Sequence, residues 1–181
     1  MASYYLDVET TGLSPANSEI ITIQYQKLDF NTKEAVGPLI ILKSWESSEK
    51  DILTQFKGFL GSPEDKWRFI GHGYNLHFEN DFLRERCIAN GLKPIKLFDR
   101  PTVDLHPVGI MMNAGQFKGS GLDKISGKEG NGLAVIGLNE SKQYSAIENY
   151  IKQEADAYIK LLVFLCKKMP EVLAEFQISL I

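Results

Sequence analysis

Two carboxylates near the start of the chain are the side chains best placed to do chemistry. Residues 7–12 read DVETTG, at the end of an apolar run and directly before a turn. Since side chains in a strand alternate between its two faces, Asp7 and Glu9 project side by side, on the face that also carries Tyr5. Like charges this close repel each other unless one is protonated or a cation lies between them. Carboxylate oxygens suit Mg²⁺ or Mn²⁺, so this hexapeptide predicts a metal site.

The size and composition of the chain limit the classes of protein to which such a site can belong. With 181 residues, 44% of them hydrophobic, we expect a single domain over residues 1–181 that buries a proper core. No apolar stretch approaches the roughly 18 residues of a membrane span and no signal-peptide pattern opens the chain, which predicts a cytoplasmic protein without membrane contact. The formal net charge of −3 argues against wrapping long duplex nucleic acid and leaves a small nucleic-acid footprint open.

The elements that must position the two acids follow from periodicity. After the first strand, alternation predicts strands over residues 19–28 and 35–43, with an edge position or bulge at Gly37-Pro38. Helical spacing and a short apolar run then predict further elements at 48–60 (helix), 67–72 (strand) and 78–90 (helix). Residues 100–142 are the least regular part, and their glycine-rich segment 119–132 is expected to hold a short helix between loops rather than a phosphate-binding loop.

The strongest helical pattern covers residues 144–168, closed by Pro170, with a short final helix through Phe176. Its apolar stripe is interrupted by Glu154 and consists of Ile147, Tyr150, Ile151, Tyr158, Leu161, Leu162 and Leu165. A buried carboxylate needs a partner or a metal, and no basic residue lies on the stripe. Glu154 therefore either reaches solvent or a distant Lys or Arg, or it faces Asp7 and Glu9 and completes an acidic cluster.

Three motifs in order resemble the DEDD superfamily of 3′-to-5′ exonucleases, and more closely its tyrosine-bearing branch, which includes polymerase proofreading domains. The first motif is residues 7–13, DVETTGL, and the second is residues 75–83, NLHFENDFL. The third is residues 150–155, YIKQEA. No histidine follows His106, so Tyr150 rather than a histidine is the candidate for orienting water.

The resemblance implies a fold and a metal centre. The fold would be ribonuclease H-like, with a central mixed sheet of about five strands flanked by helices. Asp7, Glu9, Glu79 and Glu154 would bind two divalent ions, Mg²⁺ or Mn²⁺, about 3.5–4 Å apart. With Tyr150, these four acids are the expected catalytic residues.

The resemblance also implies a substrate. The 3′ end of single-stranded DNA or RNA would be bound by the turn at Thr10, Thr11 and Gly12 together with Asn75, while Leu13 and Phe78 pack against its bases. Hydrolysis would release nucleoside 5′-monophosphates. Nothing in the sequence decides between DNA and RNA, and the oligomeric state is open, a homodimer included.

Two departures from the family pattern leave alternatives. Glu79 and Glu154 stand where the family has aspartate, and Asp81 and Asp156 each lie two residues further on and could replace them as ligands. A degenerate exonuclease-like domain that binds nucleic acid or a protein partner without cutting is therefore a second interpretation. Another two-metal nuclease on the same fold, such as an endonuclease, is a third.

Overall fold

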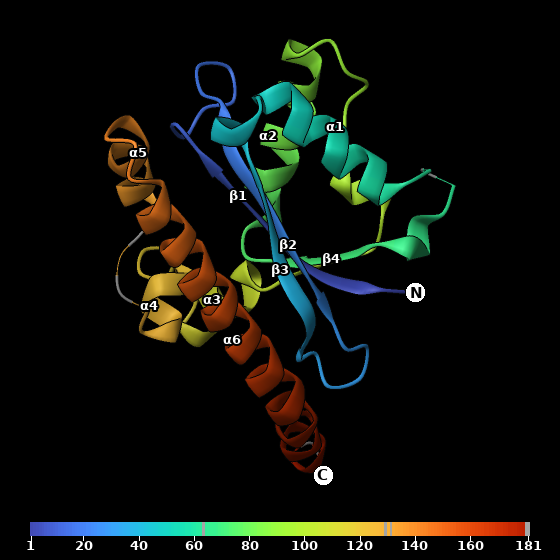
Figure 1. Ribbon diagram of the computed structural model, residues 1–181. Helices are drawn as coiled ribbons and strands as arrows, with labels where there is room; N and C mark the ends of the chain where they lie inside the picture. Colours follow the sequence, from blue (N-terminus) through green and yellow to red (C-terminus); the bar gives the residue numbers. More distant parts are fainter. Residues whose placement is uncertain (63, 129, 131, 180–181) are drawn as a thin grey trace.

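A five-stranded mixed sheet forms the centre of the structure, a computed structural model that describes residues 1–62, 64–128, 130 and 132–179 (Figure 1). The strands are β1 (Ser3–Thr10), β2 (Ile20–Leu28), β3 (Ala35–Lys43), β4 (Ile70–Gly73) and β5 (Thr102–Asp104). Their order is β3-β2-β1-β4-β5, with β1–β2 and β2–β3 antiparallel and β1–β4 and β4–β5 parallel. This sheet confirms the predicted fold class, and β3 takes the expected edge position.

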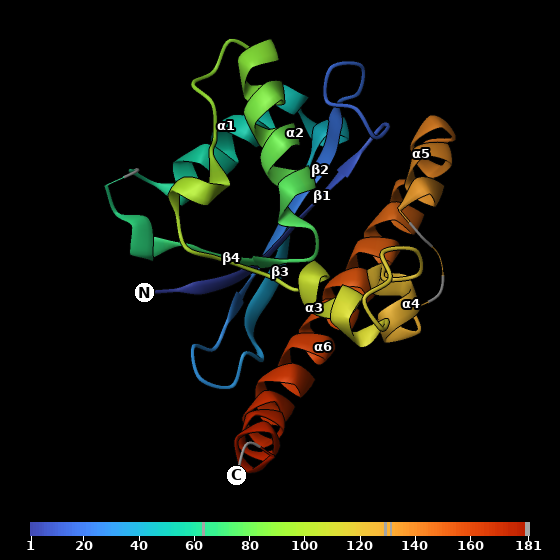
Figure 2. The same cartoon turned by 180° about the vertical axis from the view of Figure 1, so that it is seen from behind.

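Helices cover both faces of the sheet. α1 (Glu49–Leu60) and α2 (Leu76–Ala89) lie on one face, and α6 (Tyr144–Ile178) crosses the other (Figures 1 and 2). The alternation of β1 explains the two layers: Leu6 and Val8 enter the core with Phe56 of α1, while Tyr5 packs on Tyr158 of α6 with ring centroids 5.2 Å apart. Each large apolar side chain buried in this way contributes roughly 1.5–3 kcal/mol.

The stretch 100–142 is more structured than its sequence indicates. It holds β5 and three short helices, α3 (His106–Met112), α4 (Leu122–Ser126) and α5 (Leu133–Glu140). All three helices lie alongside α6 (Figure 1). The expected short helix between loops is α4. β5 has only three residues, too few for alternation to reveal a strand.

Three predicted boundaries are corrected by the structure. The short strand begins at Ile70, because Lys66–Arg68 forms a 3₁₀ turn. α2 begins at Leu76, two residues earlier than predicted. Pro170 neither ends the last helix nor separates a second one, since α6 is one helix of 35 residues with Pro170 inside it. The carbonyl of Cys166, which proline leaves without its helical donor, belongs to an exposed residue and can bind water instead.

Among the described residues, every helix is too short or too polar to span a membrane.

A partly buried ion pair joins α1, α2 and β2 and so fixes the face of the sheet from which α2 approaches the first strand. Glu49 of α1 accepts hydrogen bonds from Arg86 Nε at 2.8 Å, Asn90 Nδ2 at 2.7 Å and the backbone N–H of Ile20 at 2.7 Å. Burial by itself raises the pKa of Glu49, but the bonds from Arg86, Ile20 and Asn90 outweigh it and leave the pKa lowered. The carboxylate therefore stays charged and holds three elements together.

Replacing Arg86 by alanine tests this clamp. Arg86→Ala leaves the partly buried charge of Glu49 without its main partner, so the free energy of unfolding in urea should fall by about 1.5–3 kcal/mol. Arg84→Ala is the matched control on the same helix, because Arg84 is 43% exposed and pairs with exposed Glu85, and it should change stability by less than about 0.5 kcal/mol. Equal effects of the two substitutions would contradict the clamp.

Candidate active site

The second half of β1 leaves one side open. β4 pairs only with Ser3–Tyr5 of β1, whereas β2 pairs with β1 as far as Thr10. Asp7 and Glu9 thus lie on a stretch that has no strand neighbour toward β4. The first turn of α2 comes in at this place after the turn at Asn75, which brings residues of the second motif beside those of the first.

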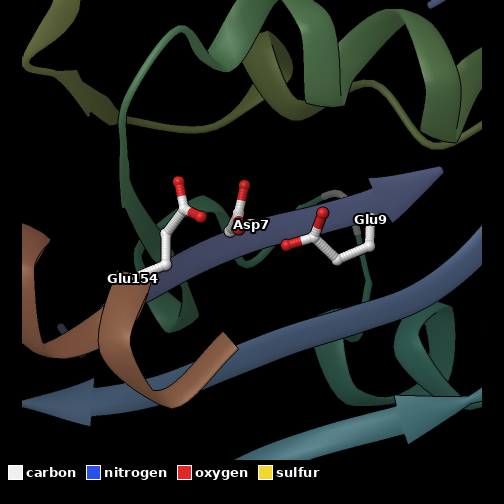
Figure 3. A group of neighbouring side chains, drawn as sticks. All are labelled: Asp7, Glu9 and Glu154. Atoms are coloured by element: carbon white, nitrogen blue, oxygen red, sulfur yellow. The ribbon is translucent and has the colours of Figure 1, made fainter. Parts of the chain in front are cut away.

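Three carboxylates converge at this opening. Oxygen atoms of Asp7, Glu9 and Glu154 all lie within 4.8 Å of one another. Figure 3 shows them turned into one space, the first two from β1 and Glu154 from α6. Glu9 is buried, and the other two are partly buried. The structure therefore brings together the acidic pair of the first strand and the acid that interrupts the helix stripe.

Glu79 joins this group from α2. Its side chain is buried, with the residue 3% exposed, and its Oε2 has no hydrogen-bond partner among the described residues. After burial, the charge of Asp7 is the next cause that raises the pKa of Glu79, so the two carboxyls are neighbours. An unsatisfied buried carboxylate oxygen is costly unless a proton or a cation meets it.

The electrostatics of the group follow from burial and crowding. Burial, with the charge of Glu154 next, raises the pKa of Asp7 to about 7. Burial and then the charges of Asp7 and Glu154 raise the pKa of Glu9 well above its ordinary value. Burial and then Asp7 do the same for Glu79. Without a cation, the group therefore holds protons that isolated carboxyls would have lost at neutral pH.

Gln24 orients Asp7 from the neighbouring strand. The two residues are directly paired between β1 and β2, and Gln24 Nε2 donates to Asp7 Oδ2 at 2.8 Å. Gln24 is fully buried, and its own oxygen accepts from the hydroxyl of Thr22 at 2.8 Å. No motif of the sequence pointed to this residue. The available signal was the polar pair Thr22 and Gln24 alternating within an apolar strand.

Lys128 is the second missed residue and pairs with Glu154. Its Nζ lies 2.8 Å from Glu154 Oε2 and 3.6 Å from the centre of the Tyr150 ring, and its side chain is only 5% exposed. Glu154 therefore does both things that its sequence position suggested: it faces the acids of β1, and it pairs with a lysine distant in the sequence. The lysine was missed because it comes from the glycine-rich segment after α4, for which no functional role was expected.

Tyr150 lies one helical turn before Glu154 and borders the same space. Burial, followed by the charge of Glu154, raises the pKa of its phenol far above the ordinary value. The hydroxyl therefore stays protonated at neutral pH, where it can donate a hydrogen bond but does not act as a base.

Asp104, at the end of β5, fixes the turn that leads into α2. Its carboxylate accepts from the backbone N–H of Asn75 at 2.8 Å and of Leu76 at 2.9 Å. Asn75 has the left-handed backbone angle φ 67°, which asparagine tolerates better than most residues. This cap places the helix that carries Phe78 and Glu79, and no motif of the sequence pointed to it.

Two cavities flank the acids, each of about 270 Å³. Asp7, Tyr150 and Glu154 line both of them. The first cavity is completed by Thr10, Gly12, Leu13 and Phe78, and by Leu133 and Ile136 of α5. The second cavity is completed by Asn75, His106, Asp123 and Lys128, and Tyr74 lines both. Asp7 and Glu154 thus lie at the boundary between the two spaces, whereas Glu9 and Glu79 line the first cavity only.

The predicted substrate-binding residues are divided between these cavities. Thr10, Gly12, Leu13 and Phe78 meet in the first cavity, but Asn75 lines the second. Thr11 lines neither, because its hydroxyl accepts from the backbone N–H of Glu19 at 2.9 Å and so closes the turn. Asn75 and Phe78 therefore line two different cavities, which adjoin at Asp7 and Glu154.

The two alternative acids lie outside the site. Asp156 is exposed and pairs with Lys160 at 2.7 Å on the outer side of α6. Asp81 is exposed and lies 3.8 Å from Arg84. Neither belongs to the acidic group, so the structure favours Glu79 and Glu154 over the register shift.

The donor set fits a divalent cation. Three carboxylates within 4.8 Å and an unsatisfied buried oxygen of Glu79 offer only hard oxygen ligands and excess negative charge. Mg²⁺ and Mn²⁺ prefer this chemistry, whereas zinc sites commonly add nitrogen or sulfur ligands.

Comparison with known proteins places the chain in a family. Residues 4–164 match the model of the RNase H superfamily. The match covers most of the chain, which therefore belongs to this superfamily, as the resemblance of its motifs predicted. No curated protein matches the sequence.

Solved structures share the fold at low sequence identity. Escherichia coli exonuclease I in complex with a dT13 oligonucleotide has a TM-score of 0.67 and 14% identity over 96% of this chain and 43% of that one. The zinc-bound form of the E. coli exonuclease I–ssDNA complex has a TM-score of 0.66 and 13% identity, over 96% and 42%. A complex of exonuclease I with SSB-Ct has a TM-score of 0.63 and 14% identity, over 94% and 42%. The chain thus spans less than half the length of these proteins.

The raised pKa of Asp7 predicts a pH-dependent stability of the metal-free protein. In the folded protein this carboxyl keeps its proton up to about pH 7, whereas in the unfolded chain it loses it near its ordinary value of 3.8. The folded state binds more protons in this window, so the free energy of unfolding falls as pH rises from 5 to 7 and then levels off. The melting temperature at pH 8 in EDTA should lie at least about 3 °C below that at pH 5, the shift that about 1 kcal/mol produces in a domain of this size.

Asp7→Asn is the control for this pH effect, because the amide cannot titrate. The fall between pH 5 and 8 should shrink in the variant, and differential scanning calorimetry measures both proteins. An identical fall in both would show that other groups cause it.

Proposed function

We propose that this protein is a metal-dependent 3′-to-5′ exonuclease that hydrolyses phosphodiester bonds at the 3′ end of single-stranded nucleic acid and releases nucleoside 5′-monophosphates. The observation that carries the proposal is the position of Asp7 and Glu154 at the boundary of two cavities of similar volume, with Glu9 and Glu79 lining the first of them. A phosphodiester at the acids would have its two nucleosides on either side. The first cavity, with Leu13 and Phe78, would bind the terminal nucleoside through apolar contacts that every base can make.

The four acids would hold the metal ions. Asp7, Glu9 and Glu154 offer oxygens to a common ion, and Glu79 would serve a second ion directly or through water. When bound, divalent ions lower the pKa of water and stabilise the leaving 3′ oxygen. The chain's own part is to fix these ligands, and Gln24 does so for Asp7 with its 2.8 Å hydrogen bond.

Tyr150 would orient the attacking water. Its hydroxyl remains protonated because burial and the nearby charge of Glu154 raise its pKa. A protonated phenol can donate to the water or to a phosphate oxygen, which places the nucleophile without removing its proton. A carboxylate of the acidic group would then take up the proton.

The comparisons support this activity. The chain belongs to the RNase H superfamily, and its fold resembles that of exonuclease I, which has been solved with single-stranded oligonucleotides. The order and spacing of the three motifs add the 3′-to-5′ direction. Sequence identity of 14% leaves the preference for DNA or RNA to experiment.

One observation supports a second candidate function, a degenerate exonuclease-like domain that binds without cutting. Lys128 neutralises part of the charge of Glu154, as expected of a degenerate domain that no longer needs metal. Such a domain would bind nucleic acid or a protein partner through the same surface without cutting.

Cleavage of a 5′-labelled single-stranded oligonucleotide in Mg²⁺ or Mn²⁺ separates these functions. We expect a ladder that shortens from the 3′ end, and no cutting of a circular oligonucleotide, which has no end. Asp7→Asn and Glu9→Gln should each lower the rate by at least about 100-fold, whereas Asp156→Asn, an exposed acid on α6, should not. Binding without cleavage would support the degenerate domain, and a cut circle would support an endonuclease.

Tyr150→Phe tests the role of the hydroxyl. Removing a positioned donor should lower the cleavage rate about 100-fold, with the affinity for the oligonucleotide little changed. Tyr144→Phe is the control on the same helix, because Tyr144 acts as a ring stacked on Trp45 at 4.6 Å. Single-turnover rates and fluorescence anisotropy measure the two quantities. Wild-type rates in Tyr150→Phe would remove this residue from the mechanism.

A further inference from the structure

Lys128 has a position that the proposed reaction does not require. Its ammonium lies 2.8 Å from Glu154 and 3.6 Å from the centre of the Tyr150 ring, and its side chain is 5% exposed. The charge also reaches Glu9, where it opposes the effect of burial on the pKa. The ammonium of Lys128 therefore places a positive charge beside Glu154, one of the candidate metal ligands.

Local structure directs Lys128 to this place. α4 ends at Ser126, and Gly127 follows with the left-handed angle φ 71°, which reverses the chain after the helix. The hydroxyl of Ser126 then accepts from the backbone N–H of Lys128 at 3.3 Å. The lysine is thus presented to the site by a helix cap of its own segment.

We propose that Lys128 is a tethered cation that competes with the metal ion for Glu154 and so sets the metal concentration at which the site fills. This inference rests on the proposed metal-dependent function. The carboxylate of Glu154 cannot neutralise an ammonium and a divalent ion at once. An ion bound to Glu154 would also be repelled by the ammonium of Lys128, which lies 2.8 Å from the same carboxylate. In the metal-free protein, the lysine lowers the repulsion among the crowded acids.

The size of the effect follows from the fraction of time that the pair is closed. If Lys128 is on Glu154 about nine-tenths of the time, the apparent affinity for the ion is reduced about tenfold. Lys128→Met keeps much of the length of the apolar stem and removes the charge. It should therefore bind Mn²⁺ about tenfold more tightly than wild type, in the absence of nucleic acid.

Mn²⁺ binding to the full chain, followed by electron paramagnetic resonance of the free ion, is the direct test. Lys160→Met is the matched control, because it removes the same charge from an exposed residue of α6 that pairs with Asp156, and its Mn²⁺ affinity should stay near wild type. Lys128→Arg keeps the charge and should also stay near wild type. A larger rise in melting temperature with Mn²⁺ for Lys128→Met than for wild type is the second readout.

The outcomes separate this proposal from the proposed function. Equal or weaker Mn²⁺ binding by Lys128→Met, in a wild type that binds Mn²⁺ and cuts, overturns the competition and leaves the exonuclease intact. An equal increase in Mn²⁺ affinity in Lys128→Met and Lys160→Met would show a general effect of net charge and would also overturn the competition. Binding by Lys128→Met where wild type binds nothing supports the competition in its strongest form, and binding by neither overturns both proposals.

Discussion

The crowding of four carboxylates around the open side of β1 is the constraint on which the rest of the site depends. Each acid is partly or fully removed from water, and burial raises the pKa values of Asp7, Glu9 and Glu79. Such a group is unstable unless positive charge or protons offset the repulsion. The structure supplies some of this through Lys128 and through the amide of Gln24, and divalent ions would supply the remainder.

The scaffold brings these acids together through three local devices. β4 is short and leaves β1 open, so that the first turn of α2 can reach it. Asp104 caps the turn before α2, and the partly buried Glu49–Arg86 pair holds that helix to its face of the sheet. α6 brings Glu154 from the other face. The acids therefore depend on contacts that lie outside the three motifs.

Local patterns in the sequence predicted β1 to β4 and singled out Asp7, Glu9 and Glu154, whereas Glu79 came from the family resemblance. They missed β5 and what depends on distant contacts. Alternation in β1 separates Asp7 and Glu9 from Leu6 and Val8, and helical period isolates Glu154, because both follow from the geometry of one element. Lys128 pairs across 26 residues, which no periodicity can reveal. Likewise, α6 continues through Pro170, although a proline inside a helix usually ends or kinks it. The carbonyl that loses its hydrogen bond belongs to exposed Cys166 and can bind water, which the local sequence does not reveal.

We propose that the acids of β1, α2 and α6 form one cation site where two cavities of about 270 Å³ meet. Anomalous diffraction from a crystal soaked with Mn²⁺ and a nucleoside 5′-monophosphate tests it most directly. We expect an anomalous peak contacted by Asp7, Glu9 and Glu154, a second peak about 3.5–4 Å away on the side of Glu79, and the nucleoside in the cavity of Leu13 and Phe78. A crystal that binds Mn²⁺ elsewhere, with Lys128 still on Glu154 and no peak among these acids, would contradict it.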